Sequence, residues 1–238
     1  MLRPRSGQAQ WVISERYDLQ PWAPATEYID SFGNLCQRYI VPQGHSRIAV
    51  QSEVEVAEHM AVDSGAGYTP IEHLPDNALV YLLQSRYSPS DKMEQRAREI
   101  VRGADPGYPQ VERIRQWIYD NHDYRYGVSH ESTDALDTLS AGAGLCRDFA
   151  HVGVALCQAL KIPARMVVGY LHRLDPMDLH AWFEAFVGGR WYSFDATQTE
   201  SRGGRIVVAY GRDIADVAFL SNFGPMEVRA MSVSVTQL

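Results

Sequence analysis

Cys146, His180 and Asp195 are the residues whose types and spacing could do chemistry together. Cys146 follows a glycine-containing stretch, residues 141–145, and precedes an apolar run at helical spacing, so we expect it in the first turn of a helix. Free backbone N–H groups and the helix dipole favour a thiolate there. We expect the Asp148 carboxylate, in the same helical turn, to stabilise these free N–H groups as well. The alternative is a small buried cysteine in a core helix.

Gly188 and Gly189 separate two runs rich in aromatic residues, which predicts a β-hairpin with a two-residue loop. That loop length fixes the register and sets Trp182 opposite Asp195. His180 and Asp195 then become diagonal neighbours on one face of the hairpin, about 7–8 Å apart at the backbone. A carboxylate at that separation can reach an imidazole, so the hairpin predicts a His–Asp pair.

A thiol, a base and a carboxylate that orients the base form the general arrangement for nucleophilic acyl transfer. Cys146 would attack an amide carbonyl, and His180 would take up the thiol proton and later protonate the leaving amine. Asp195 would fix the tautomer of His180 and stabilise its imidazolium form. Taken singly, His180 could be a solvated strand histidine and Asp195 a carboxylate at a strand end.

Four short motifs resemble those of the transglutaminase-like superfamily, whose bacterial members are usually described as candidate cysteine proteases. They are Gly144-Leu-Cys146-Arg-Asp148-Phe-Ala, Ile162-Pro-Ala-Arg165, His180-Ala-Trp182 and Phe194-Asp195-Ala-Thr. The resemblance covers about residues 10–235. It implies a papain-like core with Cys146, His180 and Asp195 as a catalytic triad. The superfamily includes transglutaminases, peptidases, amidases and members that have lost catalysis.

Four further residues are candidates for the oxyanion site or the cleft. The resemblance implies an aromatic oxyanion donor upstream of the nucleophile, and Tyr126 is our candidate beside the backbone N–H of Cys146. Trp182 would shield the His–Asp pair from water or line the substrate groove. Arg147 faces either the cleft or solvent. Asp213 would select a polar or cationic group, unless it belongs to a loop held by an ion pair.

The composition is that of a soluble globular protein of 238 residues, with 45% apolar and 21% charged residues. A formal net charge of −7 argues against nucleic acid or an anionic membrane as the main partner. No apolar run approaches the roughly 20 residues needed to cross a bilayer, and the N-terminus lacks the apolar segment of a secretory signal. We therefore expect a cytoplasmic protein.

Cys36, Cys146 and Cys157 make an odd count without a CxxC pair. Cys146 and Cys157 lie too far apart on one predicted helix for a disulfide, so free thiols are expected. Zinc bound by Cys146, His180 and Asp195 is the rival chemistry. The short-spaced ligand pairs typical of zinc sites are missing, so we expect neither a metal nor another cofactor.

The order of the elements predicts an α+β protein with an N-terminal β-rich region over residues 1–75 and a catalytic domain over 76–238. Alternating apolar residues favour antiparallel strands between residues 10 and 60, followed by a linker at 61–75. Helices are expected at about 79–83, at 91–102 and from Pro109. A buried strand should cover 166–170, and the alternation at 226–236 predicts a last strand.

The first functional hypothesis is a cysteine-dependent hydrolase that cleaves amide or peptide bonds through a thioester. The second is a transglutaminase-type acyltransferase that passes the acyl group to an amine, and the third is a non-catalytic interaction domain. The expected substrate is a peptide, a protein or a small amide. A narrow, dry acceptor tunnel would favour transfer to an amine, and an open groove would favour hydrolysis.

Overall fold

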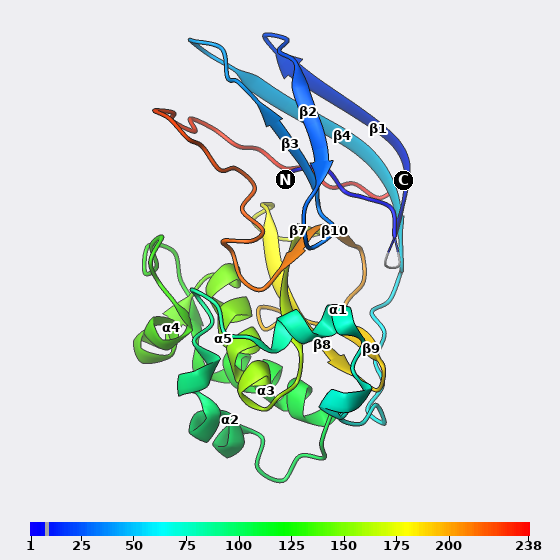
Figure 1. Cartoon of the computed structure of the whole chain (residues 1–238), viewed down its shortest axis with the longest axis vertical. Coiled ribbons are helices and arrows are strands. Elements are labelled where there is room, and N and C mark those ends of the chain that lie inside the picture. Colours follow the sequence, from blue (N-terminus) through cyan, green and yellow to red (C-terminus); the bar gives the residue numbers. More distant parts are fainter. Residues whose placement is uncertain (8–9) are drawn as a thin grey trace.

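A four-stranded antiparallel sheet forms the centre of the computed structural model, which describes residues 1–7 and 10–238 (Figure 1). The strand order is β10-β7-β8-β9. The strands span β7 (Ala164–Leu171), β8 (His180–Val187), β9 (Arg190–Phe194) and β10 (Arg205–Gly211). Every residue of β8 is buried, as expected for a strand that is paired on both sides and covered on both faces.

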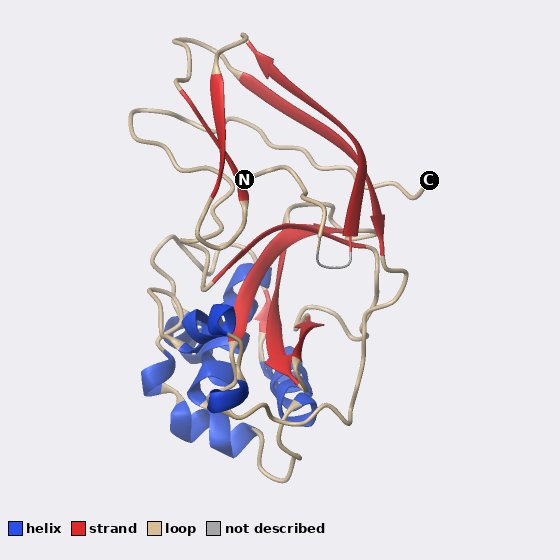
Figure 2. Ribbon diagram, turned by 45° about the vertical axis from the view of Figure 1, so that its right-hand side comes forward, coloured by secondary structure: helices blue, strands red, loops and turns tan. Residues whose placement is uncertain are grey.

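Helix α5 (Cys146–Ala159) packs on one face of this sheet and is the central helix of the molecule. Every residue from Asp148 to Ala159 is buried. The remaining helices are α1 (Asp76–Leu79), α2 (Glu94–Ile100), α3 (Tyr108–Asn121) and α4 (Ala135–Ala141), with 3-10 turns η1 (Ile71–His73), η2 (Val80–Leu82) and η3 (Ser90–Lys92). They gather at one end of the molecule (Figure 2).

A close approach between α5 and β8 depends on Gly153. A Cβ atom at this position would lie 2.4 Å from the ring of Phe183, so no larger residue fits without a shift of the helix or the ring. Phe183 is itself fully buried and stacks on Phe194 of β9, with ring centroids 5.6 Å apart. The helix that carries Cys146 is thus seated directly on the hairpin that carries His180.

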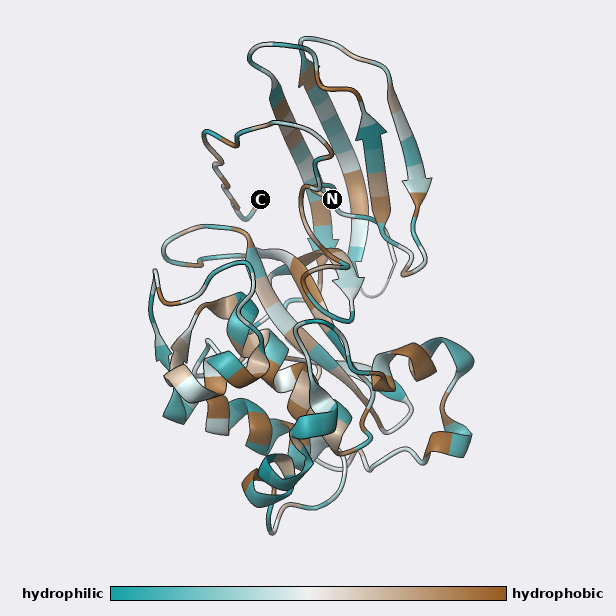
Figure 3. Cartoon of the chain, turned by 60° about the vertical axis from the view of Figure 1, so that its left-hand side comes forward, coloured by the Kyte–Doolittle hydropathy of each residue, from teal (hydrophilic) through white to brown (hydrophobic). Residues whose placement is uncertain are grey.

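Four strands at the other end of the molecule form two separate antiparallel pairs. Strand β1 (Gln10–Gln20) pairs with β4 (Arg47–Val56), and β2 (Ala25–Ile29) pairs with β3 (Leu35–Tyr39). Their alternating hydropathy is visible as bands along the strands (Figure 3). Side-chain amides join this region to β10, because Gln10 Nε2 donates to the Val207 carbonyl at 2.8 Å and Asn34 Nδ2 donates to the Tyr210 carbonyl at 2.7 Å.

The mixed helix and sheet architecture and the N-terminal strands agree with prediction. Two details differ. A 3-10 turn, η3, precedes α2, which begins at Glu94 rather than at residue 91. The predicted strand at 226–236 is wrong, because these residues are irregular and largely exposed. Alternation stabilises a strand only when a neighbouring strand accepts its hydrogen bonds, and this segment pairs with none in the described chain. No helix among the described residues is long and apolar enough to cross a membrane.

Candidate active site

The β8–β9 hairpin has the predicted two-residue turn. Gly188 and Gly189 both adopt positive φ, at 57° and 80°, which glycine allows and which matches the twist of the two strands. The pairing runs from Val187 opposite Arg190 to Phe183 opposite Phe194, in the predicted register. His180 is the first residue of β8, and Asp195 directly follows β9. The turn thus brings an imidazole and a carboxylate together.

His180 and Asp195 form a buried hydrogen-bonded pair. The distance from His180 Nε2 to Asp195 Oδ2 is 2.8 Å, and the two side chains are only 2% and 3% exposed. With Nε2 held by the carboxylate, Nδ1 is the ring nitrogen left to exchange a proton with another group. The geometry therefore fixes which nitrogen of His180 can act as a base.

The Asp195 carboxylate accepts four hydrogen bonds. Oδ2 accepts from His180 and from Arg205 Nη2 at 2.8 Å, and Oδ1 accepts from the backbone N–H and hydroxyl of Thr197, at 3.0 and 2.7 Å. Burial alone would raise the pKa of Asp195, but the charges of Arg205 and His180 overcome it and hold this pKa well below its usual range. Asp195 is therefore ionised at every physiological pH.

Cys146 is the first residue of α5, as predicted, and its side chain is partly exposed. Leu145 is the N-cap residue, and its backbone N–H donates to Asp148 Oδ2 at 2.8 Å. Asp148 thus has the predicted structural role at the helix start. The N–H of a first helical residue has no partner within the helix, so it is available to donate to another group.

The thiol of Cys146 lies close enough to the His180 ring to affect its pKa. Burial lowers the pKa of His180, but the charge and hydrogen bond of Asp195, together with Cys146, raise it to about 9. The imidazole is therefore protonated at neutral pH and can stabilise a thiolate. Cys146, His180 and Asp195 lie in series, and no group of three metal-ligating side chains is found among residues 1–7 and 10–238.

A second histidine, His151, is fully buried in α5, and its pKa is shifted in the opposite direction to that of His180. Its Nε2 accepts a hydrogen bond from the Ile214 N–H at 3.2 Å, and its ring stacks on Tyr87 with centroids 5.2 Å apart. Burial lowers its pKa to about 3. His151 therefore has to stay neutral in the folded protein, whereas His180 is folded in its charged form.

The two histidines predict opposite pH dependences of stability. Unfolded histidine has a pKa of about 6.5, so the stability that His180 contributes is complete below about pH 6.5 and is lost as the pH rises towards 9. For His151 the unfolded chain binds the extra proton, so stability is lost as the pH falls from about 6.5 towards 3. The combined contribution of His151 and His180 to the free energy of unfolding is therefore largest near pH 6.5.

Between pH 6.5 and pH 5 the free energy of unfolding should fall by about 2 kcal/mol less in His151→Gln than in the wild type, because glutamine does not titrate. Glutamine also keeps an acceptor for the Ile214 N–H. Urea unfolding of wild type and variant at both pH values measures this difference. A variant that loses as much stability as the wild type over that interval contradicts the buried neutral state of His151.

Tyr124, rather than the predicted Tyr126, is the tyrosine in contact with the thiol. Strand β5 (Asp123–Tyr124) pairs in parallel with β6 (Ala143–Gly144), which places Tyr124 beside the start of α5. Burial raises the pKa of the Tyr124 hydroxyl, and the nearby Cys146 thiol raises it further. Tyr126 is 60% exposed and packs edge-on against Tyr124, with ring centroids 5.8 Å apart.

The other three candidates have structural contacts. Trp182 is 1% exposed and lies against His180, with ring centroids 6.1 Å apart, so it covers the His–Asp pair and does not line a groove. Arg147 donates to the hydroxyl of Ser129 and the carbonyl of His130, at 3.3 and 3.1 Å.

Asp213 is 2% exposed and is bound by backbone N–H groups. Its Oδ2 accepts from Tyr87 at 3.0 Å and its Oδ1 from Ala215 at 2.8 Å. The neighbouring loop is held by an ion pair between Arg212 and Asp216, at 2.9 Å. These contacts correct the expectation that Asp213 lines a cleft, because both carboxylate oxygens are directed into the fold.

Arg205 and Thr197 belong to the site but were not predicted. Arg205 is the first residue of β10 and is followed by an apolar run, residues 206–210. A cation at the start of such a run is usually solvated, so only the folded sheet shows that Arg205 reaches Asp195. Thr197 lay within a recognised motif, and a hydroxyl two residues after a carboxylate is a common local hydrogen-bond partner. The two-residue spacing between Asp195 and Thr197 could therefore have indicated this contact.

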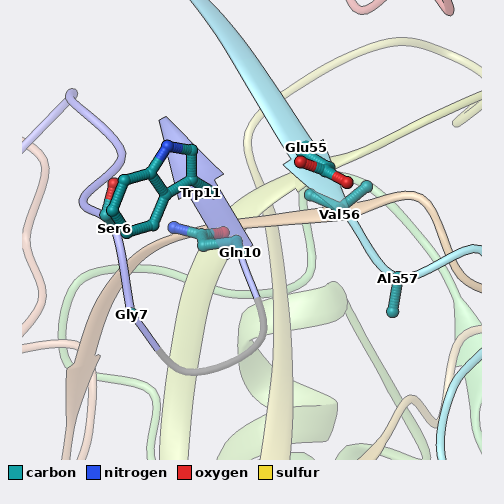
Figure 4. Close-up of a pocket in the computed structure, with 7 residues that line it drawn as sticks. All are labelled: Ser6, Gly7, Gln10, Trp11, Glu55, Val56 and Ala57. Carbon is teal, nitrogen blue, oxygen red and sulfur yellow. The ribbon is translucent and has the colours of Figure 1, made fainter. Parts of the chain in front are cut away.

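A pocket of about 560 Å³ lies away from these residues, at the ends of β1 and β4 (Figure 4). Trp11 and Glu55 face it from the two strands, and Ser6, Gly7, Gln10, Val56 and Ala57 complete its lining. None of the residues around Cys146 contributes to it. The candidate site is therefore defined by side-chain chemistry and not by this pocket.

A cysteine at the start of a helix that packs on an antiparallel sheet, with a His–Asp pair on that sheet, is the papain-like arrangement. Family comparison agrees with it. Residues 94–196 match the model of the transglutaminase-like superfamily, and residues 1–57 match the bacterial transglutaminase-like N-terminal region. The chain belongs to the transglutaminase-like superfamily.

A solved structure from Cytophaga hutchinsonii, described as a "putative cysteine protease", is 32% identical in sequence and has a TM-score of 0.84. The match covers 94% of this chain and 78% of that one. Uncharacterized proteins of Mycobacterium leprae and Mycobacterium tuberculosis are each 29% identical over 91% of this chain, which spans 82% and 77% of their lengths. The transglutaminase-like fold predicted from the motifs is thereby confirmed.

Proposed function

We propose that this protein is a cysteine-dependent hydrolase that cleaves amide or peptide bonds through a thioester. Its main support is the position of Cys146 near His180, whose Nε2 is hydrogen-bonded to Asp195. A buried carboxylate with four donors is a rigid anchor for the imidazole, and the imidazole lies beside a partly exposed thiol. This is the arrangement that nucleophilic acyl transfer needs.

In the first step Cys146 Sγ attacks the amide carbonyl carbon as a thiolate, with the proton held on His180 Nδ1. The tetrahedral intermediate collapses when the C–N bond breaks and Nδ1 delivers its proton to the leaving amine. The acyl group remains on sulfur as a thioester. Asp195 keeps its charge throughout and holds Nε2, so that Nδ1 stays directed at the reacting atoms.

In the second step neutral His180 takes a proton from a water molecule through Nδ1, and the resulting hydroxide attacks the thioester. The C–S bond breaks, a carboxylic acid leaves, and the thiolate–imidazolium pair is restored. An amine in place of water would give a new amide by the same proton transfers. The acceptor therefore decides between hydrolysis and acyl transfer.

Tyr124 and the backbone N–H of Cys146 are the proposed donors for the oxyanion. The raised pKa of Tyr124 keeps its hydroxyl protonated and able to donate. Both groups lie beside the sulfur, where charge would develop on the carbonyl oxygen, and one such donor contributes about 3 kcal/mol in acyl-transfer enzymes. Tyr124 thus takes the role first assigned to Tyr126.

The similarity to the Cytophaga hutchinsonii protein favours hydrolysis over transfer, because its description names cysteine protease chemistry. The deciding experiment is to incubate wild type and Cys146→Ala with a peptide library, with and without an added primary amine, and to follow the products by mass spectrometry. Hydrolysed fragments that require Cys146 support the proposal. Amine conjugates would assign acyl transfer, and unchanged peptides would favour a non-catalytic domain.

Alkylation should single out Cys146 among the three cysteines. Cys36 and Cys157 are 5% and 0% exposed, and burial raises the pKa of both thiols. Iodoacetamide should therefore label Cys146 far faster than the other two at pH 7. Peptide mapping after timed labelling measures the three rates. Equal slow labelling of all three would contradict a reactive thiol at the start of α5.

A further inference from the structure

Arg205 is buried although it lies on β10, an edge strand of the central sheet. Its side chain is 6% exposed, and the guanidinium lies over the ring of Trp182, 4.9 Å from the ring centroid. Nη2 donates to Asp195 Oδ2 at 2.8 Å and Nε donates to Met60 Sδ at 3.2 Å. Nη1 is buried and has no hydrogen-bond partner among the described residues. Asp195 is therefore the anion that this cation pairs with.

Arg205 and His180 bind the same oxygen atom of Asp195. His180 Nε2 and Arg205 Nη2 both donate to Asp195 Oδ2, each at 2.8 Å. In the proposed cycle His180 alternates between charged and neutral forms, so its ion pair with Asp195 exists for only part of the time. A buried carboxylate without a cation is strongly disfavoured, whereas a guanidinium never deprotonates in a protein.

We infer that Arg205 is a positioning residue of this site, which holds the Asp195 carboxylate ionised and in place while His180 gains and loses a proton. This inference rests on the proposed function. The titratable or charged groups near the His180 ring are Asp195 and the Cys146 thiol, and those near Asp195 are His180 and Arg205. Arg205 therefore supplies the permanent positive charge of this cluster.

Two substitutions separate the charge of Arg205 from its hydrogen bond. Arg205→Gln keeps an N–H donor but removes the charge, and Arg205→Lys keeps the charge but loses the planar fork. Without the cation, Asp195 acts on the imidazolium alone, so the His180 titration midpoint should rise by about one pH unit in Arg205→Gln. It should stay at the wild-type value in Arg205→Lys.

The midpoint is read from NMR spectra of ¹⁵N-labelled histidine rings, with the His180 signals assigned through His180→Gln. Thermal unfolding of each variant is recorded beside it. A lowered unfolding temperature with the same His180 midpoint in wild type and Arg205→Gln would overturn the inference, because it describes an arginine that only stabilises the fold. Should Arg205→Gln fail to fold, a changed His180 midpoint in Arg205→Lys would overturn it.

Turnover is measured with p-nitrophenyl acetate. Cys146 Sγ takes the acetyl group, p-nitrophenol leaves, and water then releases acetate from the thioester. Loss of a fixed Asp195 should slow this second step about 100-fold in Arg205→Gln, and less in Arg205→Lys. A wild-type protein that forms no acetyl-enzyme contradicts the proposed function alone, since the His180 midpoint still measures its coupling to Arg205.

Discussion

Replacing Cys146 by alanine should lower the rate of amide cleavage by about 10⁶-fold, which is the loss seen when the nucleophile of such a triad is removed. The thioester cannot form without the sulfur, so only binding and the oxyanion donors remain to help attack by water. The measurement is the initial rate of cleavage of a peptide that the wild type hydrolyses. Cys146 is partly exposed at a helix start, so the variant should fold normally.

Cys36→Ser is the matched control for this experiment. Cys36 is buried in β3, with its sulfur 4.0 Å from Asp30 Oδ2, and serine keeps a donor for that carboxylate. The cleavage rate of Cys36→Ser should equal that of the wild type. Substantial cleavage by Cys146→Ala, or a comparable loss in Cys36→Ser, would mean that the nucleophile has been misassigned.

Asp195→Asn should lower the cleavage rate by about 10⁴-fold while keeping the shape of the side chain. An amide cannot accept on both sides as the carboxylate does. Its NH2 group meets either the His180 and Arg205 donors or the Thr197 N–H, so His180 is held less firmly and Arg205 loses its counter-ion. The pKa of His180, now about 9, should fall because its largest raising influence is removed. Cleavage rates and the titration of His180 test the two effects separately.

Glu184→Gln provides a control from the same hairpin. Like Asp195, Glu184 has a buried carboxylate; it lies in β8, is paired with Arg165 at 2.6 Å and accepts from the Ser193 hydroxyl at 2.9 Å. Breaking this pair should lower stability by about 3–5 kcal/mol and leave the cleavage rate per folded molecule unchanged. If both variants lose activity to the same extent, the effect of Asp195→Asn is one of folding and not of His180 positioning.

Local rules were sufficient to predict much of the site. The Gly188–Gly189 turn fixed the register that joins His180 to Asp195, because side chains alternate across a paired hairpin. The apolar run after Cys146 placed the cysteine at a helix start. These features depend on contacts within short stretches of chain, which periodicity and turn chemistry describe directly.

Residues that depend on long-range packing were not predicted correctly. Arg205 reaches Asp195 because β10 pairs with β7, a relation that no local pattern contains. The choice of Tyr124 over Tyr126 follows from the short parallel pairing of β5 with β6. The alternation at 226–236 indicated a strand, but alternation alone does not supply a pairing partner.

The close contact between Gly153 and Phe183 makes one ring the spacer that sets the distance between sulfur and imidazole. Cys146 lies seven residues before Gly153 on a single helix, and Phe183 follows His180 by three residues on a single strand, so both reactive groups move with this contact. A methyl group added at position 153 would push the helix outward and lengthen the proton path. These two positions can therefore change only as a pair, in which growth of one side chain is matched by shrinkage of the other.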